Sequence, residues 1–360
     1  MPHARPLTSE AEFLNLVDKH FSNEHPHMAL GRGDDCAELI CPRELCLTSD
    51  LFLEDVHFRA SYFSPTDIGW KALAVNFSDL AAAGARPVGW NMNLMLPKGV
   101  SLDYVDALLQ GMADLAGQYD APLTGGDLSR ADKLGVSITA WGAPAAGVGG
   151  KFLRRSGGQA GDALFLGREG THDPGLARVG LLDLEETLRG GPAAPNPNSH
   201  SPDFPVPLAA YPTARAAHLR PRPLLELGQT LALAGVAALM DVSDGLARDL
   251  PRLLGHEGNC KEGRTPGRDP RQPLGADIRL DPGLLHPEVL AFARARGLDP
   301  VREAFLGGED YLLLGACSKA VLRGLLEQGA NLLPLGVITA GPDMVVNGQT
   351  WTGSGFDHFS

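Results

Sequence analysis

The stretch DIGWKALAVNFSDLAAAG, residues 67–84, decides how the first part of the chain folds. Its apolar side chains recur at helical spacing near one side: Ile68, Ala72, Val75 and Leu80. A capping residue at Thr66 or Asp67 precedes this pattern, and Gly84 follows it. We therefore expect a helix over 67–83.

Asp79 shares a face of this helix with Ala72, Val75 and Asn76, positions that otherwise look inward. A carboxylate turned inward is costly unless a cation or a hydrogen-bond donor meets it. Asp79 is therefore a candidate ligand for a cation, and an ordinary acid on the helix surface is the alternative.

Outward from this helix, short β-like runs alternate with amphipathic stretches. A second helix is expected from Leu102 to Tyr119, behind the capping residue Ser101. Strands are expected over 44–52 and 136–141. Such alternation is typical of an α/β or α+β domain.

The residues after 150 alternate in the same way. The expected elements are strand 163–166, helix 223–234, strand 236–240, helix 244–254, strand 278–280, helix 287–296, strand 311–314, helix 318–328 and strand 335–338. Asn347-Gly348 suits the type I′ turn of a hairpin. Two polar stretches rich in Pro or Gly, 190–207 and 255–273, predict exposed loops.

The chain has 360 residues, more than one core usually serves, since domains cluster near ~100–150 residues. The small, flexible run APAAGVGG at 143–150 is typical of an interdomain joint. We therefore expect an N-terminal domain over 1–145, a C-terminal α/β domain over 150–345, and a tail over 346–360.

Composition narrows the classes of partner. A formal net charge of −12 makes duplex nucleic acid and anionic membranes unfavourable partners. The sequence lacks the run of about 20 apolar residues that a membrane helix needs, and its first residues lack a signal peptide's apolar run, which favours a cytoplasmic protein. The five Cys are odd in number and contain no C-x-x-C pair, so free thiols are expected instead of a zinc ribbon or a disulfide framework.

Carboxylates recur beside Gly, Ser or Thr in stretches typical of turns: Gly33-Asp34-Asp35, Thr48-Ser49-Asp50, Gly125-Gly126-Asp127, Asp241-Val242-Ser243-Asp244-Gly245 and Gly307-Gly308-Glu309-Asp310. Each alone is most simply a turn, but loops at strand ends often present ligands. Oxygen ligands without a matching His/Cys set favour Mg²⁺ over zinc, and several Mg²⁺ ions imply a polyphosphate. The sequence contains neither a P-loop nor a dinucleotide-binding glycine pattern. If the polyphosphate is ATP, bound metal ions would therefore hold most of it.

The chain carries these further segments in order: GRGDDCA (31–37), TSD (48–50) followed by VHF (56–58), KALAVNFSDLAAAGARP (71–87), GGD (125–127), RSG (155–157), DVSDGL (241–246), GEDY (308–311) and GFDHF (355–359). Together they resemble the thiamine-monophosphate kinase family, from about residue 30 to the C-terminus. The helix motif and the GGEDY segment are the specific parts. GGD alone is shared with the wider aminoimidazole-ribonucleotide-synthetase-like superfamily.

The resemblance implies a two-domain aminoimidazole-ribonucleotide-synthetase-like fold of the α/β (α+β) class. It also implies a homodimer in which the N-terminal sheets join across a two-fold axis, with ATP and several Mg²⁺ ions bound near that interface. The implied reaction is transfer of phosphate from ATP to thiamine phosphate, which gives thiamine diphosphate and ADP.

The resemblance also implies roles for individual residues. The implied Mg²⁺ ligands are Asp35, Thr48, Ser49, Asp50, Asp79, Asp127, Asp241 and Asp244. The implied nucleotide contacts are Gly126, Asp127, Arg155 and Ser243, and the implied thiamine phosphate contacts are His57, Glu309 and a C-terminal aromatic, Phe359 in preference to Phe356. Asp35, Asp79, Asp127 and Arg155 would be the catalytic residues of this set.

Some positions depart from the family pattern. Arg32 stands where the family usually has an apolar residue, Leu128-Ser129 replaces a Thr-Thr pair, and strand 163–167 leads into Arg168-Glu169-Gly170 where a Thr-Gly turn is expected. The stretches 190–207 and 256–273 are also longer than expected.

The implied chemistry needs no general base, because the second pKa of a phosphate acceptor lies near ~6 and its oxygen is already anionic at neutral pH. Two alternatives remain. One is another ATP-using enzyme of the superfamily, such as a selenophosphate synthetase or a hydrogenase-maturation dehydratase, although the reactive Cys–Lys pair of the first and the C-terminal Cys of the second are absent. The other is a non-catalytic nucleotide-binding relative.

Overall fold

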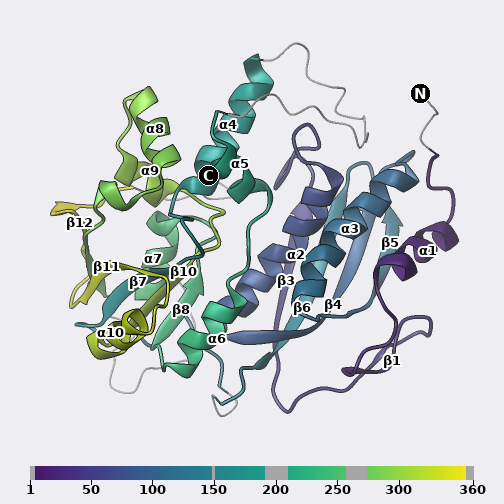
Figure 1. The fold of residues 1–360 in the computed structure, drawn as a ribbon, viewed down its shortest axis with the longest axis horizontal. Coiled ribbons are helices and arrows are strands. Elements are labelled where there is room, and N and C mark those ends of the chain that lie inside the picture. Colours follow the sequence, from purple (N-terminus) through teal and green to yellow (C-terminus); the bar gives the residue numbers. More distant parts are fainter. Residues whose placement is uncertain (1–4, 148–150, 191–209, 257–273, 354–360) are drawn as a thin grey trace. The chain divides into compact units, whose positions relative to one another are not determined.

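The computed structural model describes residues 5–147, 151–190, 210–256 and 274–353 (Figure 1). These residues form two compact units. Unit 1 comprises the residues up to Leu80, Arg86–Ala143 and the end of helix α4 from Asp183. Unit 2 comprises Ala81–Ala85, Pro144–Leu182 and the residues from Tyr211 on.

A four-stranded sheet in the order β3-β6-β4-β5 forms the base of unit 1. Its strands are β3 (Cys46–Leu53), β4 (Ala85–Leu96), β5 (Leu123–Arg130) and β6 (Gly135–Pro144). β3 pairs with β6 antiparallel along its whole length, and β4 pairs with β5 in parallel. A separate small ladder joins β1 (Met28–Leu30) to β2 (Glu38–Leu39).

Helices α2 (Pro65–Ala82) and α3 (Leu102–Gln118) lie over one face of this sheet, and α1 (Glu10–His20) packs beside α3 (Figure 1). Glycines let α2 and α3 approach closely. A Cβ atom at Gly69 would overlap the carbonyl oxygen of Leu108, so the backbones meet without intervening side chains.

Two predictions about these helices have different outcomes. The helix over 102–119 is confirmed, and Ser101 caps it by accepting a hydrogen bond from the Tyr104 N–H at 3.1 Å. The predicted cap at Thr66 or Asp67 is wrong. The helix begins at Pro65, and Ser64 Oγ accepts from the Asp67 N–H at 3.1 Å, because a proline at the start of a helix needs no hydrogen-bond partner for its nitrogen.

The strand predicted over 44–52 is confirmed as β3, whereas the other acid-bearing stretch in unit 1 with the composition of a turn lies in a strand that we did not predict. Thr48-Ser49-Asp50 lies within β3, and Gly125-Gly126-Asp127 lies within β5. Gly126 has φ +151°, and a Cβ atom there would overlap the carbonyl oxygen of Met92 on β4. Close approach of the neighbouring strand, and not a turn, is the reason for glycine at this position.

Unit 2 is built on a seven-stranded mixed sheet in the order β13-β12-β9-β11-β7-β10-β8. Its strands are β7 (Ala163–Gly167), β8 (Ala238–Asp241), β9 (Gly275–Ile278), β10 (Leu313–Cys317), β11 (Leu332–Thr339), β12 (Met344–Val346) and β13 (Gln349–Thr350). β12 and β9 run parallel, whereas β7 lies antiparallel between β10 and β11. The expected α/β (α+β) fold class is confirmed.

The helices of unit 2 are α4 (Leu176–Gly190), α5 (Pro212–Leu219), α6 (Leu225–Leu233), α7 (Leu246–Leu254), α8 (Pro287–Arg296), α9 (Pro300–Leu306) and α10 (Lys319–Glu327), with one 3-10 turn (Pro282–Leu284). Buried side chains of α4, α5, α7, α8 and α9 share one core with the strands. Among the described residues, no helix is long and apolar enough to cross a membrane.

The predicted elements of unit 2 exist, but some bounds shift. The strand expected over 278–280 instead runs over Gly275–Ile278, and the strand expected from 311 begins at Leu313. The hairpin turn is confirmed, since Asn347 and Gly348 have φ +50° and +82°. The predicted loops 190–207 and 255–273 lie almost wholly outside the described residues.

Candidate active site

In unit 1, alternate side chains of β3 point to opposite faces of the sheet. Thr48 and Asp50 are half-buried and lie opposite buried residues of β6, whereas Leu47 and Leu51 are exposed. Thr48 Oγ1 donates a hydrogen bond to Asp79 Oδ2 on α2. Thr48, Asp50 and Asp79 therefore meet on the helix-covered face, as the metal-site prediction requires.

These groups form an oxygen-rich site. Burial, and secondarily the charge of Asp79, raises the pKa of Asp50 to about 6. Two mutually repelling carboxylates beside a hydroxyl suit a hard divalent cation that keeps several waters, such as Mg²⁺. Within the described ranges no three His, Cys, Asp or Glu side chains are gathered for a metal, so Thr48 and water would complete the ligand set.

Cys46 lies on the same face of β3, and its thiol donates to the Gly142 carbonyl at 3.6 Å. Burial raises the pKa of the Cys46 thiol to about 11. It therefore remains protonated at neutral pH and does not compete as a thiolate ligand.

Ser49, a predicted metal ligand, points its side chain to the opposite face. Its hydroxyl donates to the Ile138 carbonyl at 3.1 Å and lies 2.9 Å from Thr139 Oγ1. The Ser49 hydroxyl is thus not brought together with Thr48 and Asp50.

Asp127 is also separate from the Asp50–Asp79 pair within one chain. Asp127 is exposed and pairs with Asn93 of β4, which is also exposed. The residues on either side of Asn93 are buried beneath the helices, so Asn93 and Asp127 lie on the opposite face. β5 and β3 are the two edges of the sheet, about 14 Å apart at the usual strand spacing. Asp127 and Asp50 therefore occupy opposite edges and opposite faces.

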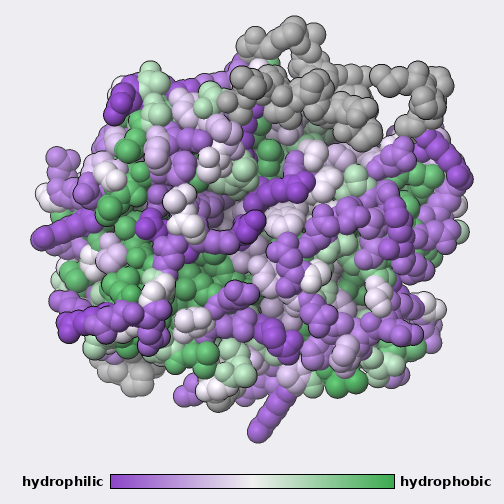
Figure 2. Space-filling model, in the orientation of Figure 1, coloured by the Kyte–Doolittle hydropathy of each residue, from purple (hydrophilic) through white to green (hydrophobic). Residues whose placement is uncertain are grey.

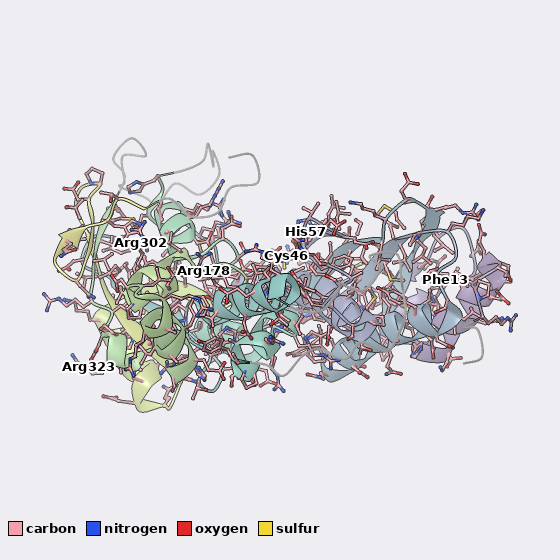
Figure 3. The ribbon with its side chains drawn as sticks, turned by 90° about the horizontal axis from the view of Figure 1, so that it is seen from above. Phe13, Cys46, His57, Arg178, Arg302 and Arg323 are labelled. Carbon is pink, nitrogen blue, oxygen red and sulfur yellow. The ribbon has the colours of Figure 1, made fainter. Side chains whose placement is uncertain are left out.

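Two other predicted residues of unit 1 lie in loops. Asp35 is exposed between β1 and β2, and its N–H donates to Asp34 Oδ1 at 2.7 Å. His57 (Figure 3) lies just after β3, where its Nδ1 accepts from the Leu53 N–H at 3.0 Å and its ring stacks on Phe52. These contacts fix the orientation of the His57 ring.

In unit 2, two predicted segments lie side by side. The Tyr311 N–H donates to the Val242 carbonyl at 2.9 Å, and the Glu309 N–H donates to the Ser243 carbonyl at 2.7 Å. A Cβ atom at Gly308 would come within 2.8 Å of the Ser243 oxygen, so glycine permits this contact. Ser243 and Glu309 are therefore neighbours.

The acids that follow β8 differ in environment. Asp241, the last residue of β8, is buried. Asp244 Oδ2 accepts from Arg252 Nη1 at 2.7 Å, and the Asp244 N–H donates to buried Asp249 at 2.9 Å. A metal ion at Asp244 would share that carboxylate with Arg252.

The predicted nucleotide contact Arg155 is exposed.

The turn that carries Glu309 is strained and anchored. Glu309 and Tyr311 have φ +63° and +51°, unusual for residues other than glycine. Between them, the buried carboxylate of Asp310 accepts from the N–H groups of Gly175 and Ala177, at 2.6 and 2.9 Å, where α4 begins. These charge-assisted bonds hold the backbone in its unusual conformation.

His218, on α5, was not singled out by the sequence analysis. Its ring is buried, and Nδ1 lies 3.1 Å from Glu309 Oε2. Only the tertiary fold brings the two residues together, and no local motif indicates it. The predicted C-terminal contacts Phe359 and Phe356 lie outside the described residues.

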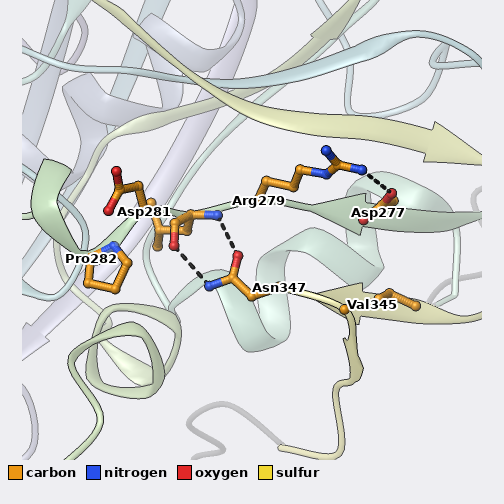
Figure 4. Close-up of a pocket in the computed structure, with 8 residues that line it drawn as sticks. Asp277, Arg279, Asp281, Pro282, Val345 and Asn347 are labelled. Atoms are coloured by element: carbon orange, nitrogen blue, oxygen red, sulfur yellow. Dashed lines mark hydrogen bonds and ion pairs between the residues drawn. The ribbon is translucent and has the colours of Figure 1, made fainter.

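A surface pocket of about 750 Å³ lies along β9 and β12 (Figure 4), and none of the predicted site residues lines it. The Asn347 amide accepts from the Leu280 N–H at 3.0 Å and donates to the Leu280 carbonyl at 2.9 Å. Arg279 lies 3.8 Å from Asp277. Asn347 and the Leu280 backbone thus satisfy one another, whereas Arg279 and Asp277 form only a loose ion pair at the surface.

Residues 33–143 match the family model "AIR synthase related protein, N-terminal domain". A thiamine-monophosphate kinase of Synechococcus elongatus is 34% identical over 347 residues, which cover 91% of each chain. The crystal structure of a thiamine-monophosphate kinase from Stenotrophomonas maltophilia matches with a TM-score of 0.73 at 29% identity, covering 97% of this chain and 100% of that one.

A further solved structure is that of AaThiL complexed with AMPPCP and TMP. It matches with a TM-score of 0.68 at 24% identity and covers 98% of this chain and 99% of that one. This likeness supports the fold.

Proposed function

The chain belongs to the thiamine-monophosphate kinase family, and from that premise we propose that it transfers the terminal phosphoryl group of ATP to thiamine phosphate. The products are thiamine diphosphate and ADP. The observation that carries this proposal is the 34% identity to a thiamine-monophosphate kinase over 91% of the chain. The AMPPCP and TMP bound by the related AaThiL are consistent with ATP and thiamine phosphate as the two substrates.

Mg²⁺ is the proposed metal. Thr48, Asp50 and Asp79 would hold one ion, since their oxygens already face one another. Further ions are proposed at Asp35, Asp127, Asp241 and Asp244. Ser49 is also a proposed Mg²⁺ ligand, although its hydroxyl points to the opposite face of β3. Gly126, Asp127, Arg155 and Ser243 are the proposed nucleotide contacts, and His57, Glu309 and Phe359 the proposed thiamine phosphate contacts.

The proposed mechanism depends on position and charge. The acceptor phosphate is already anionic at neutral pH, so no residue needs to remove a proton. Bound Mg²⁺ would neutralise the repulsion between the two anionic reactants. The carboxylates of the site would hold the metal, and the exposed guanidinium of Arg155 would direct its N–H groups toward the transferred phosphoryl oxygens.

Glu309 is proposed to select the thiamine part of the substrate. Thiamine carries a permanent positive charge, which a carboxylate attracts. The Glu309 side chain is 28% exposed and is held in place by the strained turn and by His218. It thus combines access to a ligand with a fixed direction.

We propose that the protein is a homodimer, because one face of the unit 1 sheet is not covered by the described helices and exposes apolar side chains. Leu47 and Leu51 are 69% and 54% exposed on the face that α2 and α3 leave uncovered. The side of unit 1 that carries α3 is, by contrast, largely hydrophilic (Figure 2). Exposed apolar patches of this kind mark interaction surfaces. Asp50 and Asp127 occupy opposite edges and opposite faces of one sheet, so they would serve one reaction only if the β3 edge of one subunit lies beside the β5 edge of the other.

Complementation between two inactive variants tests the homodimer. Asp50→Asn and Asp127→Asn are each expected to be inactive. If one site takes Asp50 from one subunit and Asp127 from the other, co-expression restores one intact site in each hybrid dimer, or about a quarter of wild-type activity for random pairing. A mixture no more active than its parents would contradict the shared site.

Cytoplasmic location is also a proposal. The described cysteines Cys36, Cys41, Cys46 and Cys317 are free thiols, which is typical of a reducing compartment. The net charge of −12 continues to favour small-molecule substrates over nucleic acid or membrane surfaces.

The function itself is tested by ADP release, measured with thiamine phosphate, free thiamine and other phosphorylated small molecules side by side. We expect Mg²⁺-dependent release with thiamine phosphate. Equal turnover of free thiamine would overturn the assignment of the acceptor. ATP binding without thiamine-phosphate-dependent ADP release would identify a relative that has lost turnover.

A further inference from the structure

Arg32 carries a charge, yet its side chain is only 13% exposed. A guanidinium withdrawn from water needs acceptors for its N–H groups. The contacts of Arg32 therefore show what this side chain does in the fold.

The guanidinium joins two segments that are far apart in the sequence. Nη2 donates to the Phe21 carbonyl at 2.8 Å, and Nη1 donates to the Ser22 carbonyl at 3.2 Å, just where α1 ends. Nη1 also donates to the carbonyl of Leu123, the first residue of β5, at 2.8 Å. Asp18 adds an ion pair at 3.2 Å. The fork of Arg, unlike a point charge, can reach several carbonyls at once.

The backbone of residue 32 is held as well. Asn23 Oδ1 accepts from the Arg32 N–H at 2.5 Å, and Asn23 Nδ2 donates to the Arg32 carbonyl at 2.7 Å. A Cβ atom at Gly31 would overlap Asn23 Oδ1, so glycine is needed for this clamp. Both the main chain and the side chain of Arg32 are thus fixed.

These contacts tie together two parts of the candidate site. Asp35 follows Arg32 by three residues, and Gly126 follows Leu123 by three residues along β5. We propose that Arg32 is a positioning residue that sets the Asp35 loop against the strand carrying Gly126 and Asp127. This inference rests on the proposed role of those residues in binding nucleotide and Mg²⁺.

Arg32→Met tests the inference, because it keeps the length and the apolar stem but removes every donor. We expect the dissociation constant for AMPPCP in the presence of Mg²⁺, measured by calorimetry, to rise about tenfold. The KM for ATP should rise with it, whereas the KM for thiamine phosphate should change less than about twofold. Arg32→Lys should recover only part of the affinity, since one ammonium cannot bridge the same carbonyls.

Hydrogen exchange in the ligand-free protein tests the positioning apart from the function. Amides of residues 33–37 and 123–127 should both exchange faster in Arg32→Met. Lys19→Met is the matched control, because it removes an ion pair of α1 with Asp106, 2.6 Å apart, and leaves the Arg32 contacts intact.

Three results would overturn the inference: wild-type affinity for AMPPCP in Arg32→Met, unchanged exchange in either segment, or the same changes in Lys19→Met. If Arg32→Met does not fold, Asn23→Ala serves in its place, because it removes only the two bonds to the Arg32 backbone. It should weaken AMPPCP binding and speed amide exchange in both segments. Unchanged binding or exchange in Asn23→Ala would also overturn the inference. A wild-type protein without kinase activity would refute the proposed function, while the exchange result would still decide the positioning.

Discussion

Replacing Asp50 by Asn should make the ligand-free protein more stable while removing its response to Mg²⁺. Asp50 is half-buried near Asp79, and burial followed by this charge raises its pKa from an ordinary 3.8 to about 6. The ionised form of Asp50 is disfavoured in the folded state, so the free energy of unfolding falls as pH rises from about 3.8 to about 6. Above about pH 6 it stays at this lower value. At 1.36 kcal/mol per pH unit the decrease amounts to at most about 3 kcal/mol.

Asp50→Asn keeps the shape and removes the charge, so we expect it to raise the free energy of unfolding by about 1–3 kcal/mol at pH 8 with EDTA present. Near pH 4 the difference should vanish, since Asp50 is then protonated in the folded protein. Urea unfolding followed by tryptophan fluorescence suits the measurement, because Trp70, Trp90 and Trp141 all lie in unit 1.

Asp114→Asn is the control for Asp50→Asn. Asp114 is an exposed acid on α3, and its Oδ1 accepts a hydrogen bond from Gln110 Nε2, on the same helix, at 2.6 Å. Loss of the Asp114 charge should therefore change the free energy of unfolding by less than about 0.5 kcal/mol. Mg²⁺ with AMPPCP should stabilise the wild type and the control but not Asp50→Asn. An Asp50→Asn protein no more stable than the wild type at pH 8 in EDTA would refute the reasoning.

Three further substitutions probe other parts of the site. Asp79→Asn should fold normally but lose Mg²⁺-dependent turnover, and near-normal activity at ordinary Mg²⁺ levels would remove Asp79 from the metal site. Glu309→Gln should raise the KM for thiamine phosphate about tenfold or more and leave the KM for ATP nearly unchanged, which kinetics with each substrate varied in turn would check. Gly126→Ala should displace β5 from Met92 and reduce both thermal stability and nucleotide affinity, whereas Gly125→Ala, with open space around its Cβ, should not.

Much of the fold could be predicted from local patterns, but several elements were not predicted: α1, β1, β2, β4, β5, α4, α5 and α9. Two of these, β4 and β5, are main strands of unit 1. β4 contains Pro87 and Gly89, residues that usually interrupt strands, and most of its side chains are buried, so it shows no clear alternation. β5 contains Gly125-Gly126, which is typical of a turn. Its parallel pairing with β4 decides its conformation, and a pairing between distant segments leaves no local signal.

The candidate site could be predicted as a set of residues but not as an arrangement. The helix face of Asp79 correctly indicated an inward carboxylate, and Thr48 meets it. Ser49, adjacent in the sequence, points to the other face because side chains alternate along a strand. The contact between His218 and Glu309 depends on how α5 packs near the turn, which no spacing in the sequence reveals.

The same strand therefore supports two separate properties. One set of alternate residues of β3 supplies the Thr48 and Asp50 oxygens of the proposed metal site, and the other set supplies the exposed Leu47 and Leu51 of the proposed dimer face. A shift of one residue in the pairing with β6 would exchange the two faces, burying the leucines under α2 and turning the carboxylate outward. Antiparallel pairing with β6 along the whole strand opposes such a shift. The register between β3 and β6 thus determines both the position of the proposed metal site and the surface of the proposed dimer.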